Sequence, residues 1–592
     1  MAWRRRFSAP RVDEVRWVGA APDRLAVVST EDGSSQAWAW DRASGVRRRV
    51  SDAGVGAEEV HLSADGEWVV WWLDPTGDER GRWMATPFED GPAQPLLPGL
   101  PDGWMAGISL VAGVVAAGFA TDEEHLVVVA RAGGPATTVY RHARPAGVGA
   151  EWPQGQGGLS TDGSLLAIRH AERSDIAHPA VRVIRLSDGR AVGEILDERR
   201  PVWPLAWSPV AGDERLVVGR ETGDRQRPWL WDVATGRLEE LVLDLPGDVA
   251  RAWWYPDGAA LLLHHDHDAR GSLHRLDLAG RTRTEVVPAS GTVGDAGVRP
   301  DGTVWYRSED GVRPPAWRDP SGAAVVVLPA DPPPAGRPWE DVRFIGPSGA
   351  SLQGWLMRPD GPPPYPTIVS VHGGPEHHET DAWSPLHLAY ADAGYAVLTV
   401  NYRGSTGYGA AFREALRDDI GFAESADVVA GLDHLVASGI ADPGRVVLEG
   451  WSWGGYLATL NAGLRPERWR GIVAGIPVGD LVAAHYESAP ALRAWDEAVF
   501  GGDPMAAPVI YRERNPMTYV DAVRAPVLLI AGESDSRCPL GQVMTYAHAL
   551  RAREHPVEVH LYPGGHHAND VAERIRQAEL ILDFVGRCLE EP

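Results

Sequence analysis

The segment that most constrains the fold is residues 450–456, which read Gly-Trp-Ser-Trp-Gly-Gly-Tyr. An apolar run, 445–449, precedes it and a second apolar run, 457–460, follows it, which predicts a strand, a sharp turn and a helix. Glycine at positions 450 and 454 leaves room for neighbouring backbone, so Ser452 can stand exposed at the tip of the turn. The alternative is a glycine-rich turn in which this serine only caps the helix.

Composition excludes several classes of function. The 592 residues carry a net charge of −25, which argues against nucleic acid or an anionic membrane as the main partner. The sequence contains no lysine, which excludes Ser–Lys dyads, Schiff-base chemistry and a Walker-type phosphate loop. Cys538 and Cys588 form no disulfide framework or metal motif. The N-terminal arginines are not followed by an apolar segment, so we expect a cytoplasmic protein without a metal or organic cofactor.

The first half of the chain repeats a tight acidic turn followed by a short apolar strand. Seven such turns, at intervals of 40 to 57 residues, fall at Asp23, Asp65, Asp122, Asp162, Asp213, Asp257 and Asp301. A period of this size is typical of four-stranded propeller blades, so we predict a seven-bladed β-propeller, with a pair of β-sandwiches as the alternative. The histidines and aspartates of 264–268 lack a second ligand group at a defined spacing, which favours a polar blade loop over a metal site.

A proline-rich stretch, 328–338, separates this region from one with a different pattern. We therefore predict two domains: the propeller with a short N-terminal extension and the linker over 1–335, and a catalytic domain over 336–592. In the second domain apolar strand candidates alternate with helical segments, which predicts a parallel sheet covered on both faces. The expected strands are 367–371, 396–400, 446–449, 471–475, 527–531 and 557–562, and the expected helices are 423–437, 456–463, 542–553 and 571–588.

A serine hydroxyl needs an imidazole base and a carboxylate to become a nucleophile. Asp535 follows the strand candidate 527–531, and His566 and His567 follow 557–562. The order Ser, Asp, His is that of the α/β-hydrolase fold. The residues alone do not choose between the two histidines, and Glu533 competes with Asp535 because both lie in one loop.

Several segments together resemble the prolyl oligopeptidase family of serine peptidases, in particular its acylaminoacyl-peptidase and dipeptidyl-peptidase-like branches. These segments are 371–375 (Val-His-Gly-Gly-Pro), 401–409 (Asn-Tyr-Arg-Gly-Ser-Thr-Gly-Tyr-Gly), 450–456, 535–539 (Asp-Ser-Arg-Cys-Pro) and 562–567 (Tyr-Pro-Gly-Gly-His-His). The motifs are dense over 340–590, whereas the first half resembles the family by architecture only.

The resemblance implies a triad of Ser452, Asp535 and His567, the last chosen by the family spacing from Tyr562. His566 stands where the family usually has an acidic residue or glycine, so the alternative assignment, one position earlier, stays open. The resemblance also implies an oxyanion hole formed by the backbone N–H groups of Gly374 and Trp453.

Substrate-binding residues are predicted at four positions. Arg537 matches a family arginine that binds a substrate carbonyl, with a salt bridge in its own loop as the alternative. Val478, Leu481 and Tyr486 follow the strand after the turn and are candidates for an apolar specificity pocket, although core packing explains them nearly as well.

The sequence therefore predicts a serine peptidase that cleaves short peptides or acylated amino acids near the N-terminus through an acyl-enzyme. An esterase or amidase acting on a small molecule is the first alternative, because the same triad would serve it. A propeller scaffold with an incidental hydrolase domain is the second. Neither nucleic acid nor a membrane is expected as a partner, and a homo-oligomer is left open.

Overall fold

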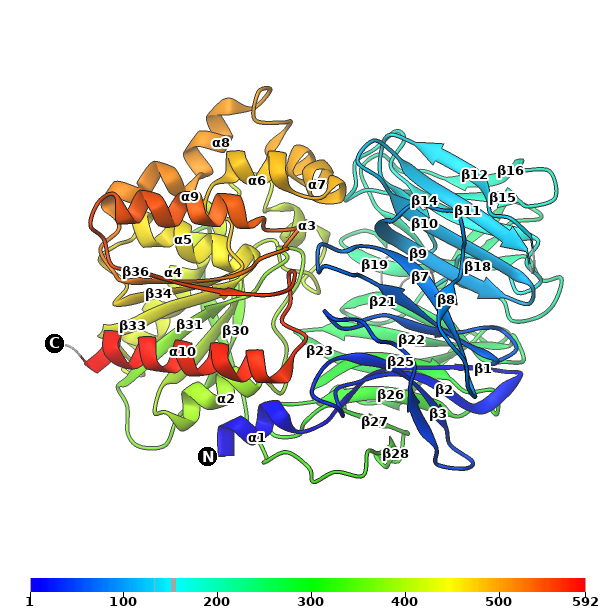
Figure 1. Cartoon of the computed structure of the whole chain (residues 1–592), viewed down its shortest axis with the longest axis horizontal. Coiled ribbons are helices and arrows are strands. Elements are labelled where there is room, and N and C mark those ends of the chain that lie inside the picture. Colours follow the sequence, from blue (N-terminus) through cyan, green and yellow to red (C-terminus); the bar gives the residue numbers. More distant parts are fainter. Residues whose placement is uncertain (1, 132–133, 151–155, 591–592) are drawn as a thin grey trace. The chain divides into compact units, whose positions relative to one another are not determined.

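The structure is a computed structural model that describes residues 2–131, 134–150 and 156–590. It divides the chain into two compact units (Figure 1). The propeller unit comprises Pro10–Ser308 and Pro315–Pro329, and the hydrolase unit comprises the N-terminal segment to Ala9, Glu309–Pro314 and the chain from Ala330 onward. This differs from the predicted boundary at 335, because the N-terminal segment and a short excursion of the last blade pack with the hydrolase unit.

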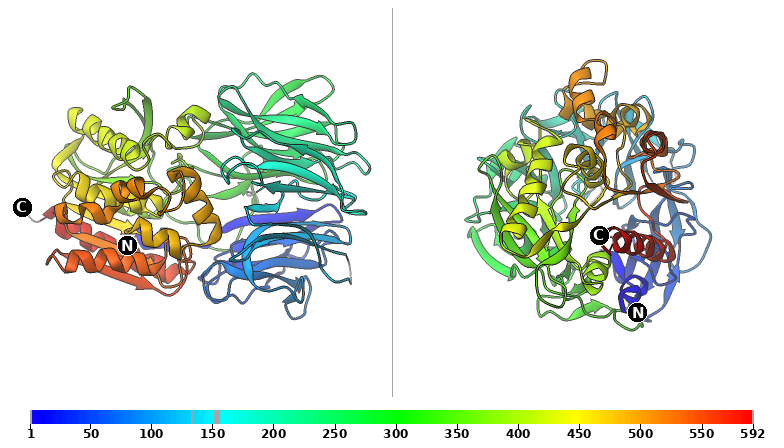
Figure 2. Two further views of the ribbon diagram at one scale, coloured as in Figure 1. Left: turned by 90° about the horizontal axis from the view of Figure 1, so that it is seen from above. Right: turned by 90° about the vertical axis from the view of Figure 1, so that its left-hand side faces the viewer.

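Within the described residues, the strands of the propeller unit form seven consecutive groups of four, one for each blade. A short pairing of β7 (Arg80–Pro87) with β9 (Gly103–Val111) joins the second and third blades into one eight-stranded sheet. Figures 1 and 2 show this unit. The first four blades are formed by β1 (Val12–Val18), β2 (Ala21–Ser29), β3 (Gln36–Asp41) and β4 (Arg47–Arg49); β5 (Val60–Leu62), β6 (Trp68–Leu73), β7 (Arg80–Pro87) and β8 (Gln94–Pro95); β9 (Gly103–Val111), β10 (Val114–Ala120), β11 (His125–Arg131) and β12 (Thr137–His142); and β13 (Ala146–Val148), β14 (Leu165–His170), β15 (Ala180–Arg185) and β16 (Ala191–Ile195). The last three are β17 (Val202–Trp207), β18 (Arg215–Thr222), β19 (Arg225–Asp232) and β20 (Arg237–Glu240); β21 (Asp248–Trp254), β22 (Ala260–His267), β23 (Arg270–Asp277) and β24 (Thr282–Val287); and β25 (Thr292–Val298), β26 (Val304–Glu309), β27 (Ala316–Arg318) and β28 (Ala324–Val326). The predicted seven-bladed propeller is confirmed.

Side chains, rather than a shared strand, join the first blade to the last in the described sheets. Each of these two blades is built from its own four consecutive strands. A common apolar cluster includes Val15 and Leu25 of the first blade and Trp305 and Trp317 of the last. An ion pair of 2.8 Å between Arg16 Nη1 and an Asp295 carboxylate oxygen adds a polar link across the same junction.

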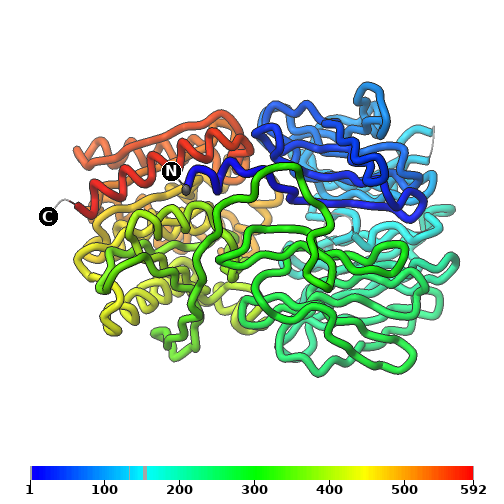
Figure 3. Tube along the Cα trace, turned by 90° about the horizontal axis from the view of Figure 1, so that it is seen from below, coloured from blue at the N-terminus to red at the C-terminus, as the bar shows by residue number. Residues whose placement is uncertain are grey.

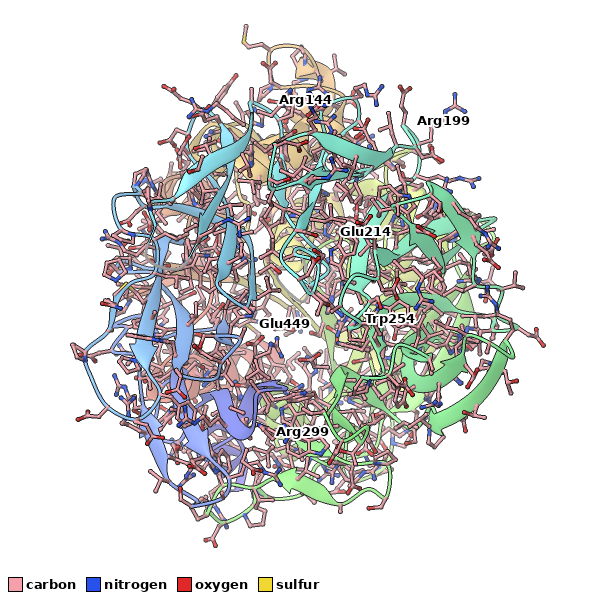
Figure 4. The ribbon with its side chains drawn as sticks, turned by 90° about the vertical axis from the view of Figure 1, so that its right-hand side faces the viewer. Arg144, Arg199, Glu214, Trp254, Arg299 and Glu449 are labelled. Carbon is pink, nitrogen blue, oxygen red and sulfur yellow. The ribbon has the colours of Figure 1, made fainter. Side chains whose placement is uncertain are left out.

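The first strands of the blades surround a cavity of about 370 Å³ in the propeller unit. Tryptophans line much of it, among them Trp17, Trp207 and Trp254, the last of which is labelled in Figure 4. Arg16 and Asp295 also reach it. The high tryptophan content of the first half thus serves both the packing between blades and this lining.

The hydrolase unit contains one sheet of eight strands in the order β29-β30-β32-β31-β33-β34-β35-β36 (Figure 1). β29 pairs antiparallel with β30 and β30 with β32, and the other neighbours are parallel. The strands are β29 (Glu340–Ile345), β30 (Ser351–Met357), β31 (Tyr365–Val371), β32 (Ala396–Asn401), β33 (Ala441–Trp451), β34 (Gly471–Gly475), β35 (Val527–Gly532) and β36 (Val557–Tyr562). This confirms the predicted α/β-hydrolase fold.

Helices cover both faces of this sheet. One core includes side chains of α4 (Phe422–Ala437), α5 (Trp453–Leu464) and α9 (Leu540–Arg551). A second core packs α2 (Pro385–Asp392) and α10 (Val571–Glu590) on the other face. The remaining helices of the described unit are α1 (Ala2–Ser8), α3 (Ala410–Glu414), α6 (Leu481–Glu487), α7 (Pro490–Phe500), α8 (Pro508–Arg514) and the 3₁₀ helix η1 (Pro516–Ala522).

The N-terminal helix α1 lies beside α10 and α2, as Figure 3 shows. Arg4 pairs with Glu579 of α10, and Arg6 pairs with Asp392 at the end of α2, each at 2.5 Å. The predicted N-terminal extension therefore belongs to the hydrolase unit. Within the described chain, no helix is both long enough and apolar enough to cross a membrane.

Candidate active site

Ser452 occupies the turn between β33 and α5. Its backbone has φ 56° and ψ −118°, a strained conformation for a residue other than glycine. A Cβ atom on Gly450 would lie 2.2 Å from the Gly454 carbonyl oxygen, and one on Gly454 would lie 2.0 Å from that of Val371. Only glycine fits at these two positions, which confirms the prediction of a tight strand-turn-helix.

His566 lies between Ser452 and Asp535. Its Nε2 atom is 3.1 Å from the Ser452 hydroxyl oxygen, and its Nδ1 atom is 2.9 and 3.1 Å from the two carboxylate oxygens of Asp535. His566 and Asp535 are buried, whereas Ser452 is half-exposed. A proton can therefore pass from the serine to the imidazole while the carboxylate holds the other ring nitrogen.

The assignment of the base to His567 is corrected by this geometry. The His567 side chain is exposed, and its ring centroid lies 4.9 Å from that of His566. The loop after β36 is folded back, because the Tyr562 hydroxyl donates to the Gly565 carbonyl at 2.9 Å and Ser534 N–H donates to the Gly564 carbonyl at 2.9 Å. These bonds bring residue 566, and not the next one, beside Asp535.

Asp535 is the carboxylate that meets the imidazole, and its competitor Glu533 is exposed. One oxygen of Asp535 accepts the backbone N–H groups of Arg537 and Cys538 at 2.8 and 2.9 Å. Burial alone would raise the pKa of this carboxyl. The His566 ring and the two N–H donors outweigh burial and lower its pKa below the usual value, so Asp535 is ionised at neutral pH.

The two residues expected to form an oxyanion hole lie on segments next to Ser452. Trp453 is the first residue of α5, where a backbone N–H has no intrahelical partner. Gly374 has φ 119°, a conformation that favours glycine. A Cβ atom on its neighbour Gly373 would lie 3.2 Å from the Ser452 Cβ and 3.7 Å from the Trp453 nitrogen, so this segment passes close to the serine.

The expected substrate-binding residues have different environments. Arg537 is exposed and adjoins the Asp535 loop. Tyr486 is 53% exposed on α6. Val478 is half-buried against the core, and Leu481 is buried within it, so these two side chains match the packing alternative that the sequence left open.

Two buried residues near the site were not singled out from the sequence. Cys538 is 4% exposed, and its sulfur lies within 4.8 Å of ligand atoms of Asp535 and His566. Glu449 is 1% exposed on β33, three residues before the serine, and accepts hydrogen bonds from Ser370 and the Trp451 indole. An acidic residue within the apolar run 446–449 was the available signal for the second; nothing in the sequence marked the first.

This fold and this arrangement of side chains define a serine hydrolase. Residues 382–592 match the model of the prolyl oligopeptidase family. The acylamino-acid-releasing enzyme of Rattus norvegicus is 30% identical over 288 residues, which are 44% of this chain and 37% of that enzyme. The chain thus matches well under half the length of this curated relative.

Solved structures extend the similarity to the whole described fold. An acylaminoacyl peptidase from Pyrococcus horikoshii superposes with a TM-score of 0.71 at 17% identity, covering 100% of this chain and 98% of the other. A puromycin-hydrolyzing peptidase from Mycobacterium tuberculosis gives a TM-score of 0.82 at 20% identity, covering 100% and 96%. These similarities support the combination of a propeller with an α/β-hydrolase domain.

Proposed function

We propose that the protein is a serine peptidase that hydrolyses short peptides near their N-terminus through an acyl-enzyme. The observation that carries the proposal is the hydrogen-bonded series Ser452, His566 and Asp535, at the ends of β33, β36 and β35. The match to the prolyl oligopeptidase family over 382–592 and the similarity to an acylamino-acid-releasing enzyme support the choice of peptides.

In this mechanism the Ser452 hydroxyl oxygen attacks the substrate carbonyl carbon while His566 Nε2 takes its proton. Asp535 keeps the other ring nitrogen protonated and stabilises the imidazolium that forms. The backbone N–H groups of Trp453 and Gly374 hold the negative oxygen of the tetrahedral intermediate.

The second half of the reaction uses the same groups. The imidazolium returns its proton to the leaving amine, and water then attacks the acyl-enzyme with His566 again as the base. We propose that Arg537, which is exposed beside the catalytic carboxylate, binds a substrate carbonyl, and that Tyr486 contributes apolar contact. A cytoplasmic location and a homo-oligomer remain predictions.

The test is product analysis on paired short peptides, one with a free and one with an acetylated N-terminus, using the wild type and Ser452→Ala. We expect the wild type to cleave near the N-terminus of at least one of the pair, and Ser452→Ala to lose at least about 10⁴-fold in kcat. If neither peptide is cleaved while a simple aryl ester is hydrolysed, the peptide proposal fails and a small-molecule esterase replaces it.

A further inference from the structure

The proposed catalytic residues share their pocket with a cysteine thiol. Ligand atoms of Asp535, Cys538 and His566 all lie within 4.8 Å of one another, and this is the one such group found among the described residues. Each side chain is buried. A carboxylate, an imidazole and a thiol in one place form a mixed oxygen, nitrogen and sulfur donor set.

We propose that Asp535, Cys538 and His566 form a site for a thiophilic divalent cation such as Zn²⁺, and that the bound ion switches hydrolysis off. Three protein ligands with a fourth position left for water is a common zinc arrangement. The set suits Zn²⁺ or Cd²⁺ rather than Mg²⁺ or Ca²⁺, because the latter two prefer oxygen ligands only.

The distances allow coordination after a small adjustment. Zinc ligands at about 2.0–2.3 Å from the metal lie roughly 3.5 Å apart in a tetrahedron. From their present limit of 4.8 Å, any two of the three donors therefore need to approach each other by at most about 1.3 Å. Rotation of the Cys538 and His566 side chains can supply a movement of this size.

A bound cation would occupy side chains that the proposed reaction requires. Both nitrogens of His566 are engaged, Nδ1 with Asp535 and Nε2 with Ser452. Coordination through either nitrogen breaks one of these bonds, and coordination by Asp535 removes the acceptor that orients the ring. The inhibition, although not the binding, rests on the proposed function.

Cys538 can act as a metal ligand only after its thiol loses a proton. Burial raises the pKa of Cys538 well above its usual value, the Asp535 charge acts in the same direction, and the Ser452 side chain lowers it. On metal binding the thiol proton leaves to solvent and the sulfur lone pair goes to the ion. Half-exposed Ser452 marks the side from which a cation can enter.

The first experiment titrates the full-length protein with Co²⁺, a coloured substitute for Zn²⁺, and follows the thiolate-to-metal charge-transfer absorption. We expect one equivalent to give this band in the wild type and in Ser452→Ala, which lacks the nucleophile but keeps all three ligands. Added Zn²⁺ should abolish the band. Cys538→Val and Cys538→Ser should show none, and Cys588→Ser, which removes the only other cysteine, is the matched control.

The second readout is inhibition of hydrolysis by Zn²⁺, with each variant normalised to its own metal-free rate. Loss of the sulfur ligand should raise the half-inhibitory concentration at least about tenfold in Cys538→Val, and not at all in Cys588→Ser. The proposal is overturned if the wild type gives no thiolate band, if the band survives in a Cys538 variant, or if Zn²⁺ inhibits Cys538→Val as strongly as the wild type. Ser452→Ala is tested for metal binding only. The metal-site proposal can therefore be judged even if the peptidase proposal fails.

Discussion

Asp535 and Glu449 are two buried carboxyl groups of the hydrolase unit, 5% and 1% exposed, yet their pKa values are shifted in opposite directions. The pKa of Asp535 is lowered, as described above, whereas burial raises the pKa of Glu449 to about 7. Asp535 meets an imidazole and two backbone N–H groups at 2.8–2.9 Å. Among the described residues, Glu449 accepts hydrogen bonds from the Ser370 hydroxyl and the Trp451 indole N–H, which are both neutral donors.

The comparison shows that depth of burial does not decide whether a carboxyl group is ionised. A buried carboxylate keeps its charge when several donors, one of them able to become cationic, point at it. With neutral donors alone the proton is retained more tightly than in water. The first arrangement suits a group that must stabilise an imidazolium, and the second suits a group that ties β33 to β31 beneath the turn.

The largest expected difference is in catalysis. Asp535→Asn keeps the shape of the side chain but cannot hold the required tautomer of His566, so we expect kcat on a short peptide to fall by about 10³–10⁴-fold. Glu449→Gln keeps the shape of a side chain whose described hydrogen bonds are with Ser370 and Trp451 and not with the proposed catalytic residues, so we expect kcat within about fivefold of the wild type. The two rates are measured side by side at pH 8. Equal losses of kcat in both variants would contradict a catalytic role for Asp535 and a structural role for Glu449.

A smaller effect is expected in the pH dependence of stability. The pKa of Glu449 is raised on folding from 4.5 to about 7, so its contribution is fully present below pH 4.5 and is lost as pH rises to about 7. Glu449→Gln removes this loss. We compare the free energy of unfolding of Glu449→Gln with that of the wild type at each pH. Between pH 4.5 and pH 8 this difference should shift in favour of the variant by on the order of 3 kcal/mol.

Urea unfolding of both proteins at pH 4.5, 6 and 8 measures this difference. Asp535 gives the matched contrast, since its lowered pKa makes a contribution that is present above pH 3.8 and lost only as pH falls further. Asp535→Asn should accordingly keep the loss of stability that deprotonation of Glu449 causes between pH 4.5 and 8. If this loss of stability with pH disappears in Asp535→Asn but not in Glu449→Gln, the raised pKa belongs to Asp535 and not to Glu449.

Much of the fold could be predicted because it repeats local rules. Acidic turns before apolar strands indicated seven blades, and apolar runs separated by helical segments indicated the parallel sheet. The two antiparallel strands β29 and β30 were missed; β29 lies at the edge of the sheet and carries exposed Glu340 and Asp341, so it lacks the apolar run of the inner strands. Composition also does not show that the N-terminal helix returns to pack on α10.

The site was predictable up to the point where it depends on contacts between distant loops. The glycines around Ser452 reveal the turn through local geometry, and the position of Asp535 follows from chain order. The choice between adjacent histidines depends on how the loop after β36 folds against the loop after β35. No local pattern in the sequence encodes that contact, and spacing carried over from the family was wrong by one residue.

The most direct test of the account is therefore the rate at which a fluorophosphonate labels Ser452, followed by intact-mass and peptide-mapping mass spectrometry, in the wild type, His566→Asn and His567→Asn. We expect rapid labelling at Ser452 in the wild type and in His567→Asn, and a rate at least about 10³-fold lower in His566→Asn. Rapid labelling of His566→Asn together with its loss in His567→Asn would contradict the assignment of the base, and labelling at a residue other than Ser452 would contradict the site itself.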